Sequence, residues 1–373
     1  MRKKRILIVH GFETYPLRAT IRDLLYCYEN YLENSLCFYL NLNSAFDIPK
    51  YILKVNYDLI IFHTVFLSAR WKGTDFFKKN IIEKCIVFEK YSCPKLILSQ
   101  DEWIHTNLLN EFVNKIGITH IGSNAGFGEW HKIYNQVDFK KVKFKQILTG
   151  YIDNKVIELA KNVQKKWVLR SNDIGYRAYK APPWLGRHGY LKTKIANVFK
   201  EEGEKNGFNV NISINESDTI TGNDWYRFLG DCKFFIGVEG GSTIIDPDGL
   251  IWNRGTEYLK KTPDASFDEI EKEVFPSMDG NLWLVCISPR HLEAIATNTC
   301  QVLVEGEYNG FLKPDRHYIP VKKDFSNLDE VFSKMRDTEF CDSLLQNAYS
   351  DIVLNEKYTY RGFLSELSEF VFK

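Results

Sequence analysis

The sequence predicts an α/β protein made of two Rossmann-like domains. The first observation is that short apolar runs alternate with stretches of helical periodicity, as in parallel sheets covered by helices. The second is that this alternation comes as two series, which meet between residues 150 and 164. The third is the length of 373 residues, which is enough for two domains that each have a core. We therefore predict domains at residues 1–155 and 156–358.

The first series contains five apolar runs that we predict as strands. The run at residues 57–63 is continuously apolar, as expected of a parallel strand that is buried on both faces. In such a domain, functional residues gather at the carboxyl ends of the strands. The predicted strands are residues 5–9, 36–42, 57–63, 94–98 and 119–122, and the predicted helices are residues 21–32, 76–91 and 108–116.

The second series begins near residues 167–169 and has one long interruption. A polar stretch at residues 246–281, which contains proline and glycine, breaks the rhythm and holds no predicted strand or helix. The predicted strands are residues 208–212, 233–237, 283–287, 301–304 and 317–321, and the predicted helices are residues 192–203, 225–231, 328–335, 342–354 and 360–372.

The composition is that of an ordinary globular protein and argues against several classes of function. With a formal net charge of +1, the chain has no overall field that attracts nucleic acid, and we expect no nucleic-acid partner. Its 8 cysteines are scattered without a Cys-x-x-Cys pair, which argues against a zinc ribbon or a thioredoxin-type site. The aromatic content of 14% is high. Such enrichment can mark a carbohydrate-binding cleft, but more often the aromatic residues simply fill the core.

The sequence shows neither a secretory leader nor an apolar segment approaching the roughly 20 residues that cross a bilayer. We therefore expect a cytoplasmic protein whose cysteines are reduced and buried. A basic run at residues 2–5 leaves open a peripheral contact with the inner face of the membrane. The alternative is a solvated cap before the first strand.

The most informative segment starts at Ser288 and combines a cation with a carboxylate at the mouth of a helix. Pro289 stands where a helix can begin, because its missing N–H is not needed there. Arg290 and Glu293 fall one turn apart on one face, and an apolar strand at residues 301–304 follows. This arrangement suits a ligand that carries phosphate and ribose hydroxyls. We predict that Arg290 binds phosphate and that Glu293 binds ribose.

The segment Arg290-x-x-Glu293-Ala294, with its short loop and apolar strand, resembles the donor-nucleotide segment of GT-B-type glycosyltransferases. The chain as a whole is similar to enzymes of this type from bacterial surface-polysaccharide gene clusters, including the spore-protein-like glycosyltransferase group. The resemblance implies two Rossmann-like domains that face a central cleft. It also implies that residues 359–373 form a helix that crosses back to the first domain.

The activity that the resemblance implies is transfer of a sugar from a nucleotide-sugar donor to a hydroxyl of a surface glycan. The acceptor would be of the O-antigen or capsule type, free or lipid-linked, and neither a cofactor nor a metal is implied. A nucleotide-sugar epimerase or phosphorylase, or a non-catalytic protein that binds a nucleotide sugar or a glycan, fits the same architecture. A dinucleotide-dependent oxidoreductase is disfavoured, because residues 10–13 do not match Gly-x-Gly-x-x-Gly.

The resemblance also assigns cations to the donor phosphates. GT-B enzymes often place Gly-Arg and a following Lys after the first strand of the second domain, and Arg187 and Lys192 match this pattern. Cations there stabilise a leaving diphosphate without a metal. The spacing departs from the pattern, so surface cations on a loop are the alternative. Arg177, just past a strand, is either a further donor contact or the partner of Asp173.

A glycine pair follows the predicted strand at residues 233–237. Gly240 and Gly241 let backbone N–H groups approach an oxyanion closely. Ser242 is expected to cap the next helix and to donate to phosphate. A turn without a ligand is the alternative.

Glu239, in the same segment, is expected to face the cleft. Retaining GT-B enzymes commonly carry a second carboxylate shortly before the ribose-binding glutamate, at a position that Val285 occupies here. Glu239 is therefore a catalytic candidate, and retention or inversion of the anomeric configuration is left open. The resemblance also implies that Asn309 contacts the donor sugar.

Candidates for a catalytic base lie at strand ends of the first domain. His10 ends the first strand, and Asp101 and Glu102 follow the fourth. Such side chains can deprotonate an acceptor hydroxyl. Adjacent carboxylates point in different directions, so we expect one of the two to face the cleft. A helix N-cap is the alternative for each of them, and His63 is a further candidate with a structural alternative.

One motif points to a metal instead. Asp246 and Asp248 flank Pro247 in an Asp-x-Asp pattern, which binds the metal–nucleotide in GT-A-type transferases. Pro-Asp-Gly is also a common turn sequence, and we favour the turn.

Overall fold

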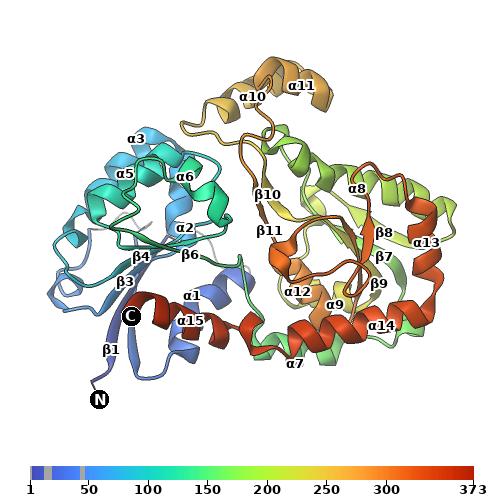
Figure 1. Cartoon of the computed structure of the whole chain (residues 1–373), viewed down its shortest axis with the longest axis horizontal. Helices are drawn as coiled ribbons and strands as arrows, with labels where there is room; N and C mark the ends of the chain where they lie inside the picture. The colour runs from blue at the N-terminus through green and yellow to red at the C-terminus, as the bar shows by residue number, and fades with distance from the viewer. Residues whose placement is uncertain (1, 12–18, 43–46) are drawn as a thin grey trace.

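The computed structural model describes residues 2–11, 19–42 and 47–373, and the residues Phe12 and Glu13 of the motif that follows His10 lie outside them. Figure 1 shows two α/β halves side by side, each with its own parallel sheet. A smaller unit with two helices stands above them in this view.

The first half is built around a six-stranded sheet in the order β2-β1-β3-β4-β5-β6, in which all neighbours are parallel. Strands form where the sequence is continuously apolar, and residues 6–9 are fully buried. The sequence does not predict β6, because Lys-Phe-Lys-Gln has one apolar residue. The strands are β1 (Lys4–His10), β2 (Ser35–Asn41), β3 (Leu59–Phe62), β4 (Lys95–Leu98), β5 (His120–Ser123) and β6 (Lys143–Gln146).

Helices cover both faces of this sheet. On one face, α1 (Ala19–Tyr31) and the last helix, α15 (Tyr360–Phe372), share a core with β1 and β4. On the other face packs α5 (Thr106–Ile116). The predicted helix at residues 76–91 is interrupted by a π-helical turn at Lys78–Ile82. The shorter helices are α2 (Thr64–Leu67), α3 (Thr74–Phe77), α4 (Glu83–Cys85) and α6 (Trp130–Ile133).

The second half holds a five-stranded parallel sheet in the order β13-β12-β9-β7-β8. Residues 167–169 form a 3-10 turn in which Val168 is 81% exposed, so the first strand starts only at Asn172. The strands are β7 (Asn172–Arg177), β8 (Val210–Ser213), β9 (Cys232–Gly237), β12 (Cys300–Val304) and β13 (Ile319–Val321). The helices are α7 (Asn154–Val163), α8 (Gly186–Lys205), α9 (Asn223–Gly230), α12 (Pro289–Ala296), α13 (Leu328–Arg336) and α14 (Thr338–Ala348).

The glycine pair does not lead into a helix, and this part of the prediction is wrong. Gly240–Ser242 forms strand β10, which pairs antiparallel with β11 (Leu284–Cys286). Gly241 has a φ of 120°, and a Cβ there would lie 1.8 Å from a carbonyl oxygen of β11, so the pairing requires glycine. The hydroxyl of Ser242 does not cap a helix but donates to the carbonyl of Ile244 and accepts from its N–H.

The polar stretch that follows is also more regular than predicted. It contains α10 (Leu250–Lys261) and α11 (Phe267–Val274), the raised pair of helices in Figure 1. α11 begins with a capping box, in which Ser266 and Glu269 each bind the other's backbone N–H. We call residues 240–286 the insertion.

The insertion joins the first half through the backbone. Asp246 pairs with Ile104 in a parallel bridge. Its N–H donates to the carbonyl of Trp103 at 2.7 Å, and its carbonyl accepts from the N–H of His105 at 2.8 Å. These hydrogen bonds join the loop after β4 to the insertion.

Four tryptophans pack at the same junction. The ring centroid of Trp252 on α10 lies 6.1 Å from that of Trp71 and 6.0 Å from that of Trp103, both in the first half. It lies 5.3 Å from that of Trp184, which precedes α8. One hydrophobic core therefore runs from the first sheet into the insertion. The halves are joined here at the top of Figure 1, and at the bottom by α15 and the chain connections.

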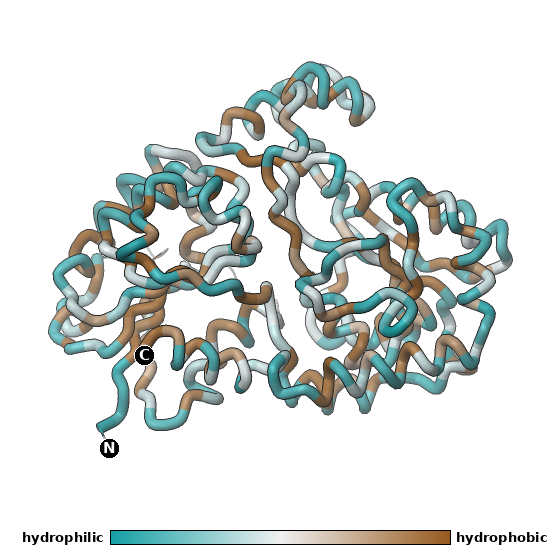
Figure 2. Tube along the Cα trace, in the orientation of Figure 1, coloured by the Kyte–Doolittle hydropathy of each residue, from teal (hydrophilic) through white to brown (hydrophobic). Residues whose placement is uncertain are grey.

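The distribution of hydropathy follows this architecture. In Figure 2, hydrophobic segments run through the interior of each half, whereas the outer helices alternate between hydrophobic and hydrophilic residues. Within the described parts of the chain, none of the helices has both the length and the apolar character that a membrane span requires.

Candidate functional site

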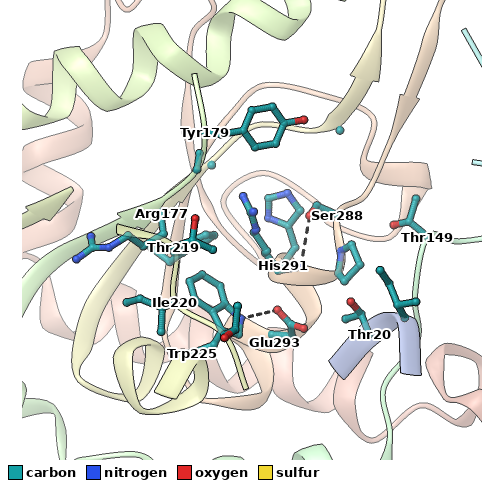
Figure 3. Close-up of a pocket in the computed structure, with 18 of the residues that line it drawn as sticks. Thr20, Thr149, Arg177, Tyr179, Thr219, Ile220, Trp225, Ser288, His291 and Glu293 are labelled. Carbon is teal, nitrogen blue, oxygen red and sulfur yellow. Dashed lines mark hydrogen bonds between the residues drawn. The ribbon is translucent and has the colours of Figure 1, made fainter. Parts of the chain in front are cut away.

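A pocket of about 370 Å³ lies between the two sheets, at the carboxyl ends of their strands. The first half contributes α1 and the segments after β3, β4 and β6. The second half contributes the ends of β7 and β9, the loop before α9 and the first turn of α12. Figure 3 shows side chains of both halves facing this space. Doubly wound sheets bind their ligands at this edge.

The first turn of α12 points at the pocket. Ser288 caps the helix, because its hydroxyl accepts a hydrogen bond from the N–H of Arg290 at 3.4 Å. Pro289 fills the first helical position, as the sequence predicts. The remaining N–H groups and the helix dipole make this turn favourable for an anion.

Two cations of the pocket are not neutralised. Among the described residues, none forms an ion pair or a hydrogen bond with the side chain of Arg290 or Lys192. The guanidinium of Arg290 lies 5.9 Å from the ring centroid of Trp225. Burial lowers the pKa of Lys192, which the charge of Asp101 opposes. A cation in such surroundings gains from binding an anion.

Glu293 is the acidic group of the pocket, and only 9% of it is exposed. Its carboxylate accepts a hydrogen bond from the indole N–H of Trp225 at 2.6 Å (Figure 3). Burial raises the pKa of Glu293, whereas the bond from Trp225 and the charge of Arg290 oppose the rise. When ionised, the carboxylate can also accept hydrogen bonds from hydroxyls of a ligand.

Several residues of the pocket are missed by the sequence analysis. Tyr179 is 54% exposed at the pocket, and residues 219–222 form the loop before α9. Trp225, the partner of Glu293, looks in the sequence like an ordinary core aromatic. The loop could have been found from its position, because it follows a strand of the second sheet at the carboxyl end.

Arg177 lines the pocket, but its guanidinium is directed at the sheet. It donates to the backbone and side-chain oxygens of Asn211 at 2.7 Å and 2.5 Å and lies 4.6 Å from the ring centroid of Phe228. Asp173 is not its partner, since that carboxylate binds Lys233 at 2.7 Å. Arg177 and Asp173 therefore each bind other residues of the second half and not one another.

The predicted phosphate pair is split by the structure. Lys192 on α8 reaches the pocket. The side chain of Arg187 is 60% exposed and pairs with Glu271 and, at 3.2 Å, with Asp268, both on α11. Arg187 thus holds the insertion rather than lining the pocket.

The glycine segment reaches the pocket at one residue. Gly240 lines it, whereas Gly241 and Ser242 lie beyond it in β10. Ser242 is fully buried, and its hydroxyl donates a hydrogen bond to the carbonyl of Ile244 in the same segment. The segment therefore contributes backbone, not a hydroxyl, to the wall.

Glu239 and Asn309 shape the loop after β12. The buried carboxylate of Glu239 accepts a hydrogen bond from the N–H of Tyr308. The side-chain oxygen of Asn309 accepts one from the N–H of Ile287 at 2.6 Å. Glu239 therefore ties the loop to the end of β9, and Asn309 ties it to the segment that leads into α12.

Glu102, after β4, is fully buried within the first half. Its carboxylate accepts hydrogen bonds from the N–H groups of residues 124 and 125 at 2.9 and 3.3 Å. It also accepts one from the hydroxyl of Tyr134 at 2.5 Å. This group does not face the cleft.

Asp101 is exposed and follows Gln100, which lines the pocket. No described residue hydrogen bonds its carboxylate. Partial desolvation raises the pKa of Asp101, and the charges of Arg70 and Lys192 oppose the rise. Neither of the two adjacent carboxylates lines the pocket, and Asp101, next to Gln100, is the exposed one.

His10 and His63 lie at the ends of β1 and β3. Burial lowers the pKa of His10 to about 4 and that of His63 to about 3, so both are neutral near pH 7. His63 caps α2, since its Nδ1 accepts from the N–H of Val65 at 3.4 Å. Neither histidine lines the pocket, although Thr64 does.

The Asp-x-Asp motif serves the junction with the insertion. The carboxylate of Asp246 accepts from the N–H of Trp252 at 2.9 Å, and that of Asp248 accepts from the amide of Asn107 at 2.8 Å. In the part of the chain that the structure describes, no three His, Cys, Asp or Glu side chains are grouped as around a metal ion.

Solved structures of very low sequence identity share this fold. A structure of Anabaena Alr3699/HepE in complex with UDP and glucose covers 98% of both chains, with 10% identity and a TM-score of 0.54. Sucrose-phosphate synthase from Thermosynechococcus elongatus covers 99% of both, with 10% identity and a TM-score of 0.53. An α,α-trehalose-phosphate synthase (UDP-forming) from Burkholderia xenovorans, in complex with glucose-6-phosphate, covers 99% of this chain and 100% of that one, with 8% identity and a TM-score of 0.51.

These likenesses confirm the predicted fold class, an α/β protein with two Rossmann-like domains in the GT-B architecture. No protein-family model matches the sequence, and no curated protein matches it.

Proposed function

We propose that this protein is a glycosyltransferase that moves a sugar from a nucleotide-sugar donor to a hydroxyl of an acceptor glycan. The observation that carries the proposal is the gathering, in one pocket between the halves, of unneutralised Arg290 and Lys192 with the buried Glu293. A helix N-terminus with Arg290 in its first turn and Lys192 in the same pocket suits a diphosphate, and a carboxylate one turn along the helix suits a ribose. The fold supports the proposal, since HepE was solved with UDP and with UDP-glucose.

In this proposal the second half holds the donor. Arg290 and Lys192 bind the diphosphate, and Glu293, oriented by Trp225, accepts hydrogen bonds from the ribose. When the bond between sugar and diphosphate breaks, charge develops on the diphosphate. The two cations and the first turn of α12 stabilise that charge, and no metal is part of the proposal.

The first half presents the acceptor. We propose a cytoplasmic enzyme that acts on a surface glycan of the O-antigen or capsule type, free or lipid-linked, as in the enzymes that the sequence resembles. The basic start of the chain is partly used within the fold. Arg2 pairs with Asp58, and Lys4 lies 3.5 Å from the ring centroid of Phe372. These contacts favour a cap before the first strand over a peripheral membrane contact.

A thermal-shift screen against UDP, GDP, CMP, ADP, dTDP and their common sugar conjugates tests the proposal. A ligand that binds only the folded state at about 100 times its Kd adds about 2.7 kcal/mol to the free energy of unfolding. One nucleotide is expected to raise the Tm of the wild type clearly more than that of Arg290→Ala. The exposed Arg187 offers a matched control, and Arg187→Ala is expected to keep the shift.

A wild type that no nucleotide stabilises would contradict the proposal. Conversion of the donor without an acceptor would favour an epimerase or a phosphorylase on the same fold. Binding without turnover on any acceptor extract would favour a non-catalytic protein.

A further inference from the structure

Arg70 is a buried cation that serves one loop. It is 1% exposed, and it forms no ion pair with the described residues. Its guanidinium donates to four backbone carbonyls, those of residues 67, 100, 101 and 104, at 2.9, 3.0, 2.6 and 3.0 Å. Three of these carbonyls belong to the segment after β4. A buried charge that is satisfied by one segment fixes the shape of that segment.

The segment that Arg70 holds has an unusual backbone. Asp101 has a φ of 49° and His105 a φ of 51°, so two residues with a Cβ adopt left-handed conformations close together. Such conformations persist where the surroundings impose them, and they cluster at functional sites. Between them, Trp103 and Ile104 are buried at the junction with the insertion. The segment is therefore fixed from two sides, by Arg70 and by the insertion.

This rigid segment presents the carboxylate of Asp101 without a partner. The next carboxylate, that of Glu102, is buried with three donors, so the absence of a donor at Asp101 is specific to that position. Asp101 itself does not line the pocket, but it follows Gln100, which lines it from the first half, as Lys192 does from the second. Among the described residues, Asp101 is thus an exposed negative group beside the pocket, whereas Glu293 within the pocket is buried.

We propose that Asp101 is the specificity-determining group for the sugar that the donor carries, with Arg70 as its positioning residue. This inference rests on the proposed function. A fixed carboxylate accepts hydrogen bonds from two neighbouring hydroxyls and repels an acid group. The sugar is therefore a neutral one with free hydroxyls, and not a uronic or phosphorylated sugar.

Binding of matched nucleotide sugars tests the assignment of Asp101 without requiring an acceptor. UDP-glucose and UDP-glucuronate differ only in a hydroxymethyl and a carboxylate group; GDP-mannose and GDP-mannuronate serve if the protein selects GDP. We expect the wild type to bind the neutral sugar about tenfold more tightly or better. In Asp101→Asn the ratio should fall toward one, while the affinity for the free nucleotide is kept. Asp268→Asn, an exposed carboxylate on α11, should keep the wild-type ratio.

Arg70→Lys tests the positioning role. Lysine keeps the charge but cannot reach four carbonyls, so the ratio should fall while the affinity for the free nucleotide stays the same. A native Tm with an undiminished ratio in Arg70→Lys would overturn this role. An undiminished ratio in Asp101→Asn would overturn the assignment of Asp101 and leave the donor site standing. A wild type that binds no nucleotide would remove both the inference and the proposed function.

Discussion

The two walls of the cleft are built differently. The wall from the second half places the cations Arg290 and Lys192 and the buried Glu293 at the pocket. Among the described residues, those of the first half that line the pocket are uncharged, as Thr20 and Thr64 illustrate, and its carboxylate Asp101 lies beside the pocket. Unpaired charge in a partly dry site lowers stability, so a fold gains by concentrating it where a charged ligand binds. The first wall is then free to vary with the acceptor.

The insertion holds the two walls of the cleft at a fixed spacing. Domains of one chain generally move relative to each other unless a large apolar interface joins them. Trp252→Ala removes the central ring of that interface, and the free energy of unfolding should fall by about 3 kcal/mol. Chemical denaturation measures the loss. Trp71, which is 42% exposed, is the matched control, and an equal loss in Trp71→Ala would contradict the central place of Trp252.

Arg290→Ala removes charge from the second wall and should weaken the binding of a nucleoside diphosphate by about 2 kcal/mol. The ligand-free variant should lose little stability, because the guanidinium forms no ion pair or hydrogen bond with a described residue and loses only its longer-range attraction to Glu293 and its contact with Trp225. Titration calorimetry gives the Kd, and denaturation gives the stability. An unchanged Kd would place the phosphates elsewhere.

The pH dependence of donor binding sharpens the role of Glu293. Burial raises its pKa, so the ionised form is lost at a higher pH than for an ordinary glutamate. Affinity should therefore decrease as the pH is lowered from neutrality, and Glu293→Gln should abolish this dependence. UDP-glucose is the better ligand for this titration, because a terminal phosphate has its own pKa of about 6. A dependence that survives in Glu293→Gln would assign it to another group.

The adjacent carboxylates of the first half should have opposite effects on stability. Desolvation raises the pKa of Glu102 as well as that of Asp101, but only Glu102 binds donors among the described residues. Glu102→Gln leaves these converging donors without enough acceptors, and the free energy of unfolding should fall by about 1 kcal/mol. The pKa of Asp101 is raised in the folded state, so its ionisation lowers stability as the pH rises. Asp101→Asn should therefore be at least as stable as the wild type at neutral pH. Thermal melts of both variants decide this.

The parts that the sequence predicts well are those decided by neighbouring residues. Continuous apolar runs gave β1 and β3, and the order Ser288, Pro289, Arg290 set the start of α12 and the face that carries Glu293. Here the cap, the helical period and the polarity all act within one or two turns. Neighbouring residues therefore suffice to predict where the helix starts and which face carries Glu293.

The parts that it does not predict depend on partners far away in the chain. Arg187 and Lys192 look equivalent until α11 supplies Glu271 to Arg187. The sequence does not distinguish Asp101 from Glu102, because the difference comes from distant residues. Arg70 donates a hydrogen bond to the backbone of Asp101, and Tyr134 donates one to the carboxylate of Glu102. The helices of the insertion were missed for the same reason, since the side chains that bury them lie in both halves.

The last helix also sets the order in which the first half can be completed during synthesis. Phe363, Leu364 and Leu367 of α15 pack on a face of the sheet that includes Ile6 and Leu96. Chains are made from the amino terminus, so this sheet face emerges from the ribosome long before its cover does. The nascent chain must carry an open apolar surface until α15 has emerged, and a chaperone that shields such surfaces would act on it during that interval.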